Sequence, residues 1–143
     1  MTTQTFDAVT LVPGAASAPI LRLDKPLSFW GGLDSATGTI IDRLHPQHGA
    51  CVAGRILMMP TGRGSSSGSA TLAEALRLGK GPAAILMLER DAIVVVGAMV
   101  AVELYELACP VALADRRDWE TLAAAASLAL EAGPNGAAIS ADL

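Results

Sequence analysis

Residues 56–69 contain the apolar run Ile56-Leu57-Met58-Met59-Pro60 and then the polar stretch Gly62-Arg63-Gly64-Ser65-Ser66-Ser67-Gly68-Ser69, which we call the serine loop. The apolar run predicts a buried strand, and apolar residues spaced through 71–78 predict a helix after the loop. N–H groups at a helix start lack intrahelical partners and, with the helix dipole, favour an anion. Serine hydroxyls and a guanidinium add anion-binding groups. A flexible loop whose serine caps the helix fits the same residues, and both interpretations stay open.

The composition indicates one domain with a core of small apolar side chains. Of the 143 residues, 52% are hydrophobic but only 3% are aromatic, so Ala, Val, Leu, Ile and Met must fill the core. A net charge of −4 without a basic tract argues against a nucleic-acid partner. No apolar stretch approaches the roughly 20 residues of a membrane-spanning helix. The N-terminus lacks a secretory signal, so the sequence predicts a cytoplasmic protein without membrane association.

Strand, loop and helix alternate through the middle of the chain, with strands near both ends. The tail predicts a short helix at 118–125, with Asp118 as N-cap, and then a hairpin across residues 133–136. The expected strands are 8–12, 18–23, 37–42, 52–59, 83–88 and 110–113, and the other helices are 71–78 and 94–105. Gly54 is expected to break the strand 52–59. This order predicts an α/β fold of the β/β/α type, as a sandwich or a partly closed barrel.

The cysteines and histidines do not have the spacing of a complete metal site. Cys51 and Cys109 lie far apart in the sequence, and both are expected to pack as small hydrophobic residues rather than to form a disulfide. His45 and His48 share one predicted turn but have no adjacent third ligand. This pattern favours hydrogen bonding by the imidazoles, with general-base work as the minor alternative.

Residues 27–34 hold one of the two tryptophans and one of the two phenylalanines, directly before Gly31-Gly32. A glycine pair permits a sharp bend or lets another group approach the backbone closely. This stretch is compatible with two interpretations equally. In the first, its aromatic residues fill the core before a turn; in the second, it is part of the functional site.

Taken together, these motifs resemble the small subunit of the aconitase X family. The resemblance runs in register from about residue 8 to 113, and more weakly to the end. The residues that carry it are Ser28-Phe29-Trp30-Gly31-Gly32-Leu33-Asp34, Thr37-Gly38, Ile41-Asp42, His45-Pro46, the serine loop, Glu74, Pro82-Ala83-Ala84-Ile85 and Glu103-Leu104-Tyr105. It implies the swivelling β/β/α domain of aconitases, here as a separate small subunit of residues 1–143 that works with a large subunit.

The resemblance also implies an activity. Family members dehydrate small hydroxy acids, and bacterial ones similar to this chain act on cis-3-hydroxy-L-proline, whereas archaeal ones act on mevalonate 5-phosphate. An iron or iron–sulfur centre is held by cysteines of the large part, so this chain alone is expected to bind no metal. The enzyme would close with this chain as a mobile lid and would be inactive without its large subunit.

Residue roles follow from the same resemblance. In true aconitases and isopropylmalate isomerases the equivalent loop reads Gly-x-Gly-Ser-Ser-Arg-Glu, and its first serine is the base, which makes Ser65 the expected catalytic residue. The arginine that grips a substrate carboxylate is replaced by Ser67 here, so Arg63 or a large-subunit residue is expected to do this work. The expected substrate-binding residues are Arg63, Gly64, Ser66, Ser67, Gly32 and Asp34. There are two alternatives to this function. The chain could be the small subunit of a mevalonate 5-phosphate dehydratase, or a non-catalytic module that binds a partner.

Overall fold

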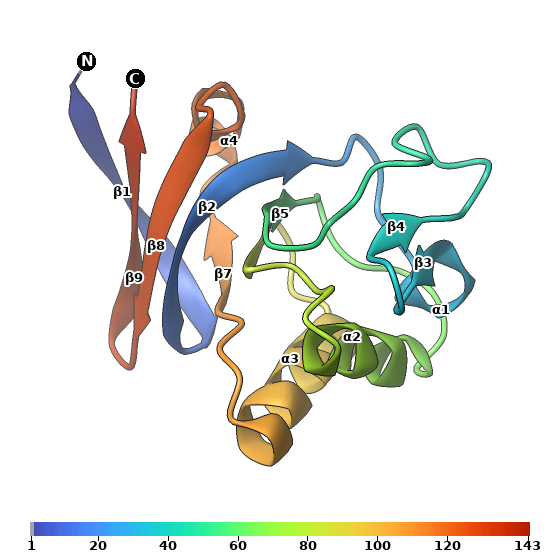
Figure 1. Ribbon diagram of the computed structural model, residues 1–143. Coiled ribbons are helices and arrows are strands. Elements are labelled where there is room, and N and C mark those ends of the chain that lie inside the picture. Colours follow the sequence, from blue (N-terminus) through green and yellow to red (C-terminus); the bar gives the residue numbers. More distant parts are fainter. Residues whose placement is uncertain (1) are drawn as a thin grey trace.

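The computed structural model describes residues 2–143 and contains a closed seven-stranded barrel with helices against one side (Figure 1). Its strands follow the spatial order β1-β7-β6-β5-β2-β8-β9, and pairing between β9 and β1 closes the ring. The strands are β1 (Thr3–Val12), β2 (Gly14–Arg22), β5 (Ile56–Met58), β6 (Ala84–Met87), β7 (Val111–Ala114), β8 (Ser127–Gly133) and β9 (Gly136–Asp142). The predicted α/β class is confirmed, and the barrel is fully rather than partly closed.

Four neighbouring strands of the barrel, β2, β5, β6 and β7, run parallel to one another. Every residue of β5 and β6 is buried, which confirms the prediction of a parallel strand covered on both faces at residues 83–88. The carboxyl ends of parallel strands meet at one edge of a sheet, where ligands of α/β proteins bind. This edge carries the connections that follow each strand, including the serine loop after β5.

Helices α2 (Gly68–Arg77) and α3 (Ala92–Tyr105) lie side by side against the outer face of the parallel strands (Figure 1). Gly97 permits their close approach, because a Cβ at this position would stand 2.9 Å from the Ser69 carbonyl oxygen. The core between helices and sheet is aliphatic and includes Leu57, Ile85 and Leu72. The sequence prediction of a core built from small and aliphatic side chains is thereby confirmed.

A second apolar cluster fills the barrel interior. It joins inward-facing residues of the strands, among them Met58, Leu86 and Leu130, with Trp119 and Leu122 of α4 (Trp119–Ala123). The short helix α4 follows the 3₁₀ turn η1 (Arg116–Asp118) and precedes the β8–β9 hairpin, as the sequence predicts. The side chain that caps this turn is Asp115, whose carboxylate accepts the Arg117 N–H at 3.0 Å.

The segment between β2 and β5 forms a separate lobe beside the barrel. It contains α1 (Phe29–Gly32) and the two-stranded pair β3 (Leu33–Asp34) and β4 (Thr39–Ile40), followed by the turns of residues 41–51. His45 is buried in this lobe: its Nε2 lies 3.0 Å from the Lys25 carbonyl oxygen, and its Nδ1 accepts the Gln47 N–H at 3.0 Å. The hydrogen-bonding interpretation of this histidine is confirmed.

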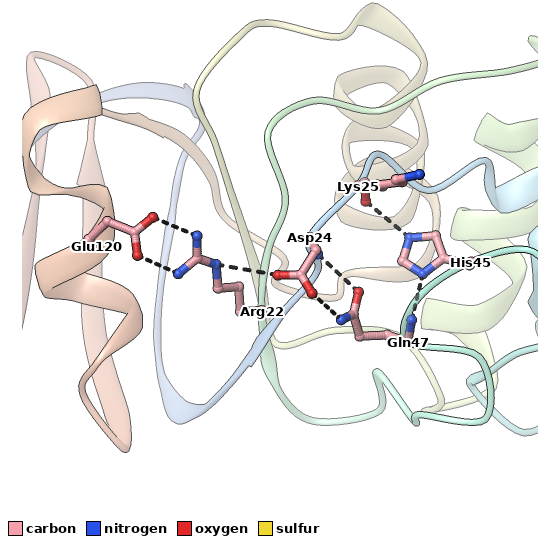
Figure 2. A network of polar contacts seen from close by, with 6 residues as sticks. All are labelled: Arg22, Asp24, Lys25, His45, Gln47 and Glu120. Atoms are coloured by element: carbon pink, nitrogen blue, oxygen red, sulfur yellow. Dashed lines mark hydrogen bonds and ion pairs between the residues drawn. The ribbon is translucent and has the colours of Figure 1, made fainter.

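A chain of polar contacts ties this lobe to α4 across the end of β2 (Figure 2). The Gln47 amide donates to the Asp24 carboxylate at 2.7 Å and accepts the Asp24 N–H at 2.9 Å. The Arg22 guanidinium forms a fork with the Glu120 carboxylate, with N–O distances of 2.6 and 2.7 Å. The hydrogen bonds raise the pKa of Arg22 and lower the pKa of Glu120.

Some local predictions were wrong. Cys51 is exposed, because it lies on an isolated bridge opposite Thr39, although Cys109 is buried as expected. Asp118 makes no side-chain capping bond, since Asp115 takes that role. The expected strand 52–59 is limited to β5, because residues 53–55 form a turn in which Gly54 has a φ of +68°. The helix predicted over residues 71–78 ends at Arg77, and Leu78 at its C-cap is 41% exposed.

Candidate functional site

The serine loop lies beside the segment that leads from β2 into α1. Leu27 and Gly62 form a parallel bridge, and the Arg63 N–H donates to the Leu27 carbonyl at 3.4 Å. In Figure 1 the connection from β5 to α2 passes next to α1, at the start of α2. Two stretches that the sequence analysis treats separately, residues 27–32 and residues 62–69, are therefore neighbours at the carboxyl edge of the parallel strands.

Glycines hold the serine loop between its two neighbours. Gly64 has a φ of +99°, and a Cβ there would stand 2.1 Å from Ser28 Oγ. On the other side, a Cβ at Gly62 would stand 2.9 Å from both Asp91 Cγ and Val94 Cγ2. At these two positions a side chain would collide with the residues that support the loop. The glycines therefore serve close packing, which fixes the loop against α1 and α3.

Asp91 links the serine loop to α3. Its carboxylate accepts the Val94 N–H at 3.0 Å and caps the helix, and the same carboxylate packs against Gly62. Ser69 adds a second link, because its hydroxyl donates to the Ile93 carbonyl at 2.7 Å. The sequence analysis missed Asp91 because it began the helix at residue 94. An aspartate three residues before that point is an N-cap signal that would have located it.

Ser65 is exposed at the turn that leads into α2. Its Oγ accepts the Ser67 N–H at 3.1 Å, and its carbonyl accepts the Gly68 N–H at 2.9 Å. A hydrogen bond donated to this oxygen favours a negative charge on it. Ser67 is the N-cap residue of α2, but it makes no side-chain capping bond. The serine side chain that accepts a backbone N–H at the start of this helix is therefore that of Ser65.

The other predicted site residues divide into two groups. Arg63, Gly64, Ser66 and Ser67 are all exposed along the serine loop. Among residues 2–143, Arg63 takes part in none of the ion pairs. Its guanidinium therefore has no internal carboxylate that would compete with a ligand.

Gly32 and Asp34 lie further along the neighbouring segment. Gly32 is buried at the end of α1, and its carbonyl accepts the Ile41 N–H at 2.8 Å. The Asp34 carboxylate accepts the Ala36 N–H at 3.0 Å, and its carbonyl accepts the Gly38 N–H at 2.7 Å. These contacts organise the β3–β4 turn rather than the serine loop. A substrate contact by either residue stays a prediction.

Comparison with known proteins identifies the relatives of this fold. Residues 5–138 match the aconitase X swivel domain. The chain belongs to this family. In the crystal structure of Thermococcus kodakaraensis aconitase X (holo-form), a chain with 25% identity superposes with a TM-score of 0.77, covering 98% of this chain and 99% of that one.

Two kinds of relative of this aconitase X swivel domain are found. Cis-3-hydroxy-L-proline dehydratases of Pseudomonas aeruginosa and Hypocrea jecorina are 46% and 40% identical over 76% and 90% of this chain. The matched regions span 19% and 22% of those relatives, so the chain corresponds to about a fifth of their length. The phosphomevalonate dehydratase small subunit of Methanothermobacter thermautotrophicus is 38% identical over 66% of this chain and 72% of its own.

The aconitase X context implies an iron–sulfur enzyme, but the described residues of this swivel domain do not fit such a centre. Within residues 2–143, no three His, Cys, Asp or Glu side chains gather as metal ligands. Burial raises the pKa of the Cys109 thiol to about 12, whereas cluster ligands are thiolates. Cys51 lies apart from it on the surface. We therefore derive no catalytic step through a metal held by this chain.

Among residues 2–143, no helix combines the length and the apolar character that crossing a membrane requires.

Proposed function

We propose that this swivel domain is the small subunit of a two-chain hydro-lyase that dehydrates cis-3-hydroxy-L-proline, with Ser65 as the base. The observation that carries the proposal is the Ser65 hydroxyl itself, exposed at the start of α2 with the Ser67 N–H on its oxygen at 3.1 Å. The names of the Pseudomonas aeruginosa and Hypocrea jecorina relatives support the choice of substrate.

The reaction requires a base next to the substrate Cα. In the proposed step, the alkoxide of Ser65 takes the Cα proton, the C–H electron pair forms the Cα=Cβ double bond, and the Cβ–O bond breaks. The leaving hydroxide takes a proton from an acid assigned to the large subunit and departs as water. A serine oxygen acts as a base only where negative charge on it is stabilised. The Ser67 N–H and the start of α2 provide such an environment, and Arg63 adds a positive charge nearby. Positioned proton transfer contributes about 10²–10⁴-fold to the rate.

Substrate binding is assigned to the other exposed groups of the same loop. Arg63 is free to form a charge-assisted pair with the substrate carboxylate. The hydroxyls of Ser66 and Ser67 would orient substrate oxygens, and Gly64 would contribute its exposed backbone between Arg63 and Ser65. Gly32 and Asp34 complete the proposed set from the neighbouring segment.

A large subunit completes the site in this proposal. Residues 63–67 are all exposed, whereas proton abstraction of this kind needs a site from which water is excluded. A second protein surface that closes over the serine loop would exclude water and bring the remaining catalytic groups. The iron or iron–sulfur centre of the family is assigned to that subunit, and the chain alone is expected to be inactive.

A phosphomevalonate dehydratase is the second candidate. The observation that favours it is the match to small subunits of that enzyme, which extends over 72% of the Methanothermobacter thermautotrophicus protein. Against it stands the charge of the serine loop, in which Arg63 is the one cationic residue. A phosphate ester and a carboxylate together would require more positive charge from the large subunit.

An assay of the assembled complex tests the proposal. The chain is combined with its co-encoded large subunit, and turnover of cis-3-hydroxy-L-proline and of mevalonate 5-phosphate is measured for the native chain and for Ser65→Ala. Ser17→Ala, an exposed serine on β2, is the matched control. We expect turnover of cis-3-hydroxy-L-proline only. Its rate should fall by at least about 10²-fold in Ser65→Ala and stay unchanged in Ser17→Ala.

Each other result has a definite meaning. Equal turnover by native and Ser65→Ala complexes would remove Ser65 from the mechanism. Turnover of the phosphate ester alone would establish the second candidate. An assembled complex that turns over neither compound would favour a non-catalytic module.

A further inference from the structure

The two tryptophans of the chain occupy opposite environments. Trp119 is 6% exposed and belongs to the apolar cluster of the barrel interior, whereas Trp30 is 60% exposed. Tryptophan is a large and mostly buried residue type, and an exposed indole beside the proposed catalytic loop is available to contact a ligand. The core of this chain does not use Trp30.

The backbone around Trp30 is firmly held. Phe29, directly before it, is 2% exposed and anchors the turn in the core. The Ser28 hydroxyl donates to the Trp30 carbonyl at 2.9 Å, and Gly31, directly after it, has a φ of +77°. An exposed aromatic side chain on such a fixed turn is a preorganised binding surface, because little backbone freedom is lost when a ligand binds.

Trp30 also lies next to the proposed catalytic loop. Its backbone nitrogen is 3.6 Å from the position of a Cβ on Gly68, the first residue of α2. The hydroxyl of Ser28, which holds the Trp30 carbonyl, packs under Gly64 of the same loop. Trp30 and Ser65 therefore belong to neighbouring turns on one edge of the barrel.

We propose that Trp30 is the specificity-determining residue that binds the ring and the secondary ammonium of a proline-type substrate on its indole face. This inference rests on the proposed function. A tryptophan face carries partial negative charge and attracts a cation. The substrate is a zwitterion, so its carboxylate would pair with Arg63 while its ammonium lies against Trp30. A phosphate ester has no cation for the indole and would bring a second anion to this face.

The test observes Trp30 directly in the complex. The chain is produced with 5-fluorotryptophan and assembled with an unlabelled large subunit, so that only Trp30 and Trp119 give ¹⁹F resonances. Trp30→Phe assigns the two signals. L-proline is added as an unreactive probe, and tetrahydrofuran-2-carboxylate serves as a probe of the same shape without the cation. We expect L-proline to shift the Trp30 resonance while the resonance of the buried Trp119 stays in place. Tetrahydrofuran-2-carboxylate should bind at least about twofold more weakly than L-proline.

Steady-state kinetics provide the second measurement. Trp30→Leu is expected to raise KM for cis-3-hydroxy-L-proline by about 2- to 30-fold, the range of a cation–π contact, with a smaller change in kcat. Trp30→Phe should recover most of the loss because it keeps an aromatic face. Leu44→Ala is the control, because Leu44 is 93% exposed in the turns of residues 41–51.

Two results would overturn the inference: a Trp30 resonance that moves only when the large subunit is added, or one that responds equally to both probes. The first would make Trp30 an interface residue. The proposed function fails separately, if Ser65→Ala keeps its turnover, and the Trp30 shift on L-proline binding is measured independently of that result.

Discussion

Gly64 lies directly against Ser28, so that a Cβ on this glycine would stand 2.1 Å from Ser28 Oγ and 2.7 Å from Ser28 Cβ. Its φ of +99° is also unfavourable for any residue with a side chain. The second contact is with an atom next to the backbone, so rotation of the Ser28 hydroxyl cannot remove it. The serine loop and the turn before α1 therefore keep their relative position only with glycine here.

Gly64→Ala should displace the serine loop and lower the dehydratase activity that we propose for the complex. The collision with Ser28 displaces the loop, which we expect to lower kcat by more than 10-fold. The backbone strain by itself lowers the free energy of unfolding by about 1–3 kcal/mol. Gly49→Ala separates the two effects, because Gly49 has a φ of +89° but open space around it. We expect that control to lose stability in urea and keep its activity in the complex. Full activity in Gly64→Ala would show that the loop adapts to the side chain.

Asp91→Ala should destabilise the start of α3. Removal of an N-cap aspartate costs about 0.5–2 kcal/mol, and the contact with Gly62 is lost with it. The measurement is the urea midpoint at unchanged m. Asp118→Ala is the matched control, since Asp118 stands at a helix start without a side-chain capping bond. If both variants lost the same stability, the capping bond of Asp91 would not be the cause.

The Arg22–Glu120 ion pair should make the free energy of unfolding depend on pH. The hydrogen bonds from Arg22 hold the pKa of the Glu120 carboxyl below its usual range, so the pair stabilises the fold above the unfolded-state pKa and loses this effect as the pH falls through the folded-state pKa. Glu120→Gln should therefore be less stable than the native chain at neutral pH. The difference should shrink as the pH falls below the unfolded-state pKa of about 4.3, and vanish below the lowered folded-state pKa of Glu120.

Urea unfolding of both chains across the acid range measures this difference. Glu103→Gln, an exposed residue that forms no ion pair within the described part of the chain, controls for the loss of one charge. A difference between native and Glu120→Gln chains that stays constant down to the acid limit would show that the pair adds nothing through its charge.

Features that depend on nearby residues could be predicted from the sequence. The apolar run at 83–88, the helix near 94–105 and the turn at 133–136 each carry their own periodicity or turn chemistry, and all three are present in the structure. The pairing of β1 with β9 could not be read in this way, because it joins residues at opposite ends of the chain. Closure of the barrel is a long-range property without a local signal.

The candidate site was predictable only in part. The serine loop was recognisable from its residues, but its packing against Ser28 and Asp91 depends on turns that bring three distant segments together. Phe29 and Trp30 are adjacent aromatic residues, and their sequence does not distinguish the one that is buried from the one that is exposed. The roles of the site residues stay predictions until the complex is assayed.

The closure of the barrel by β1 and β9 also brings the two chain ends together. The Thr2 N–H donates to the Leu143 carbonyl at 3.3 Å, and the Leu143 N–H donates to the Thr2 carbonyl at 3.0 Å. Figure 1 places both ends on the side of the barrel away from α1. A polypeptide joined to either end would thus leave from the same point. Fusion in either order, or circular permutation through a short linker, is compatible with an undisturbed serine loop.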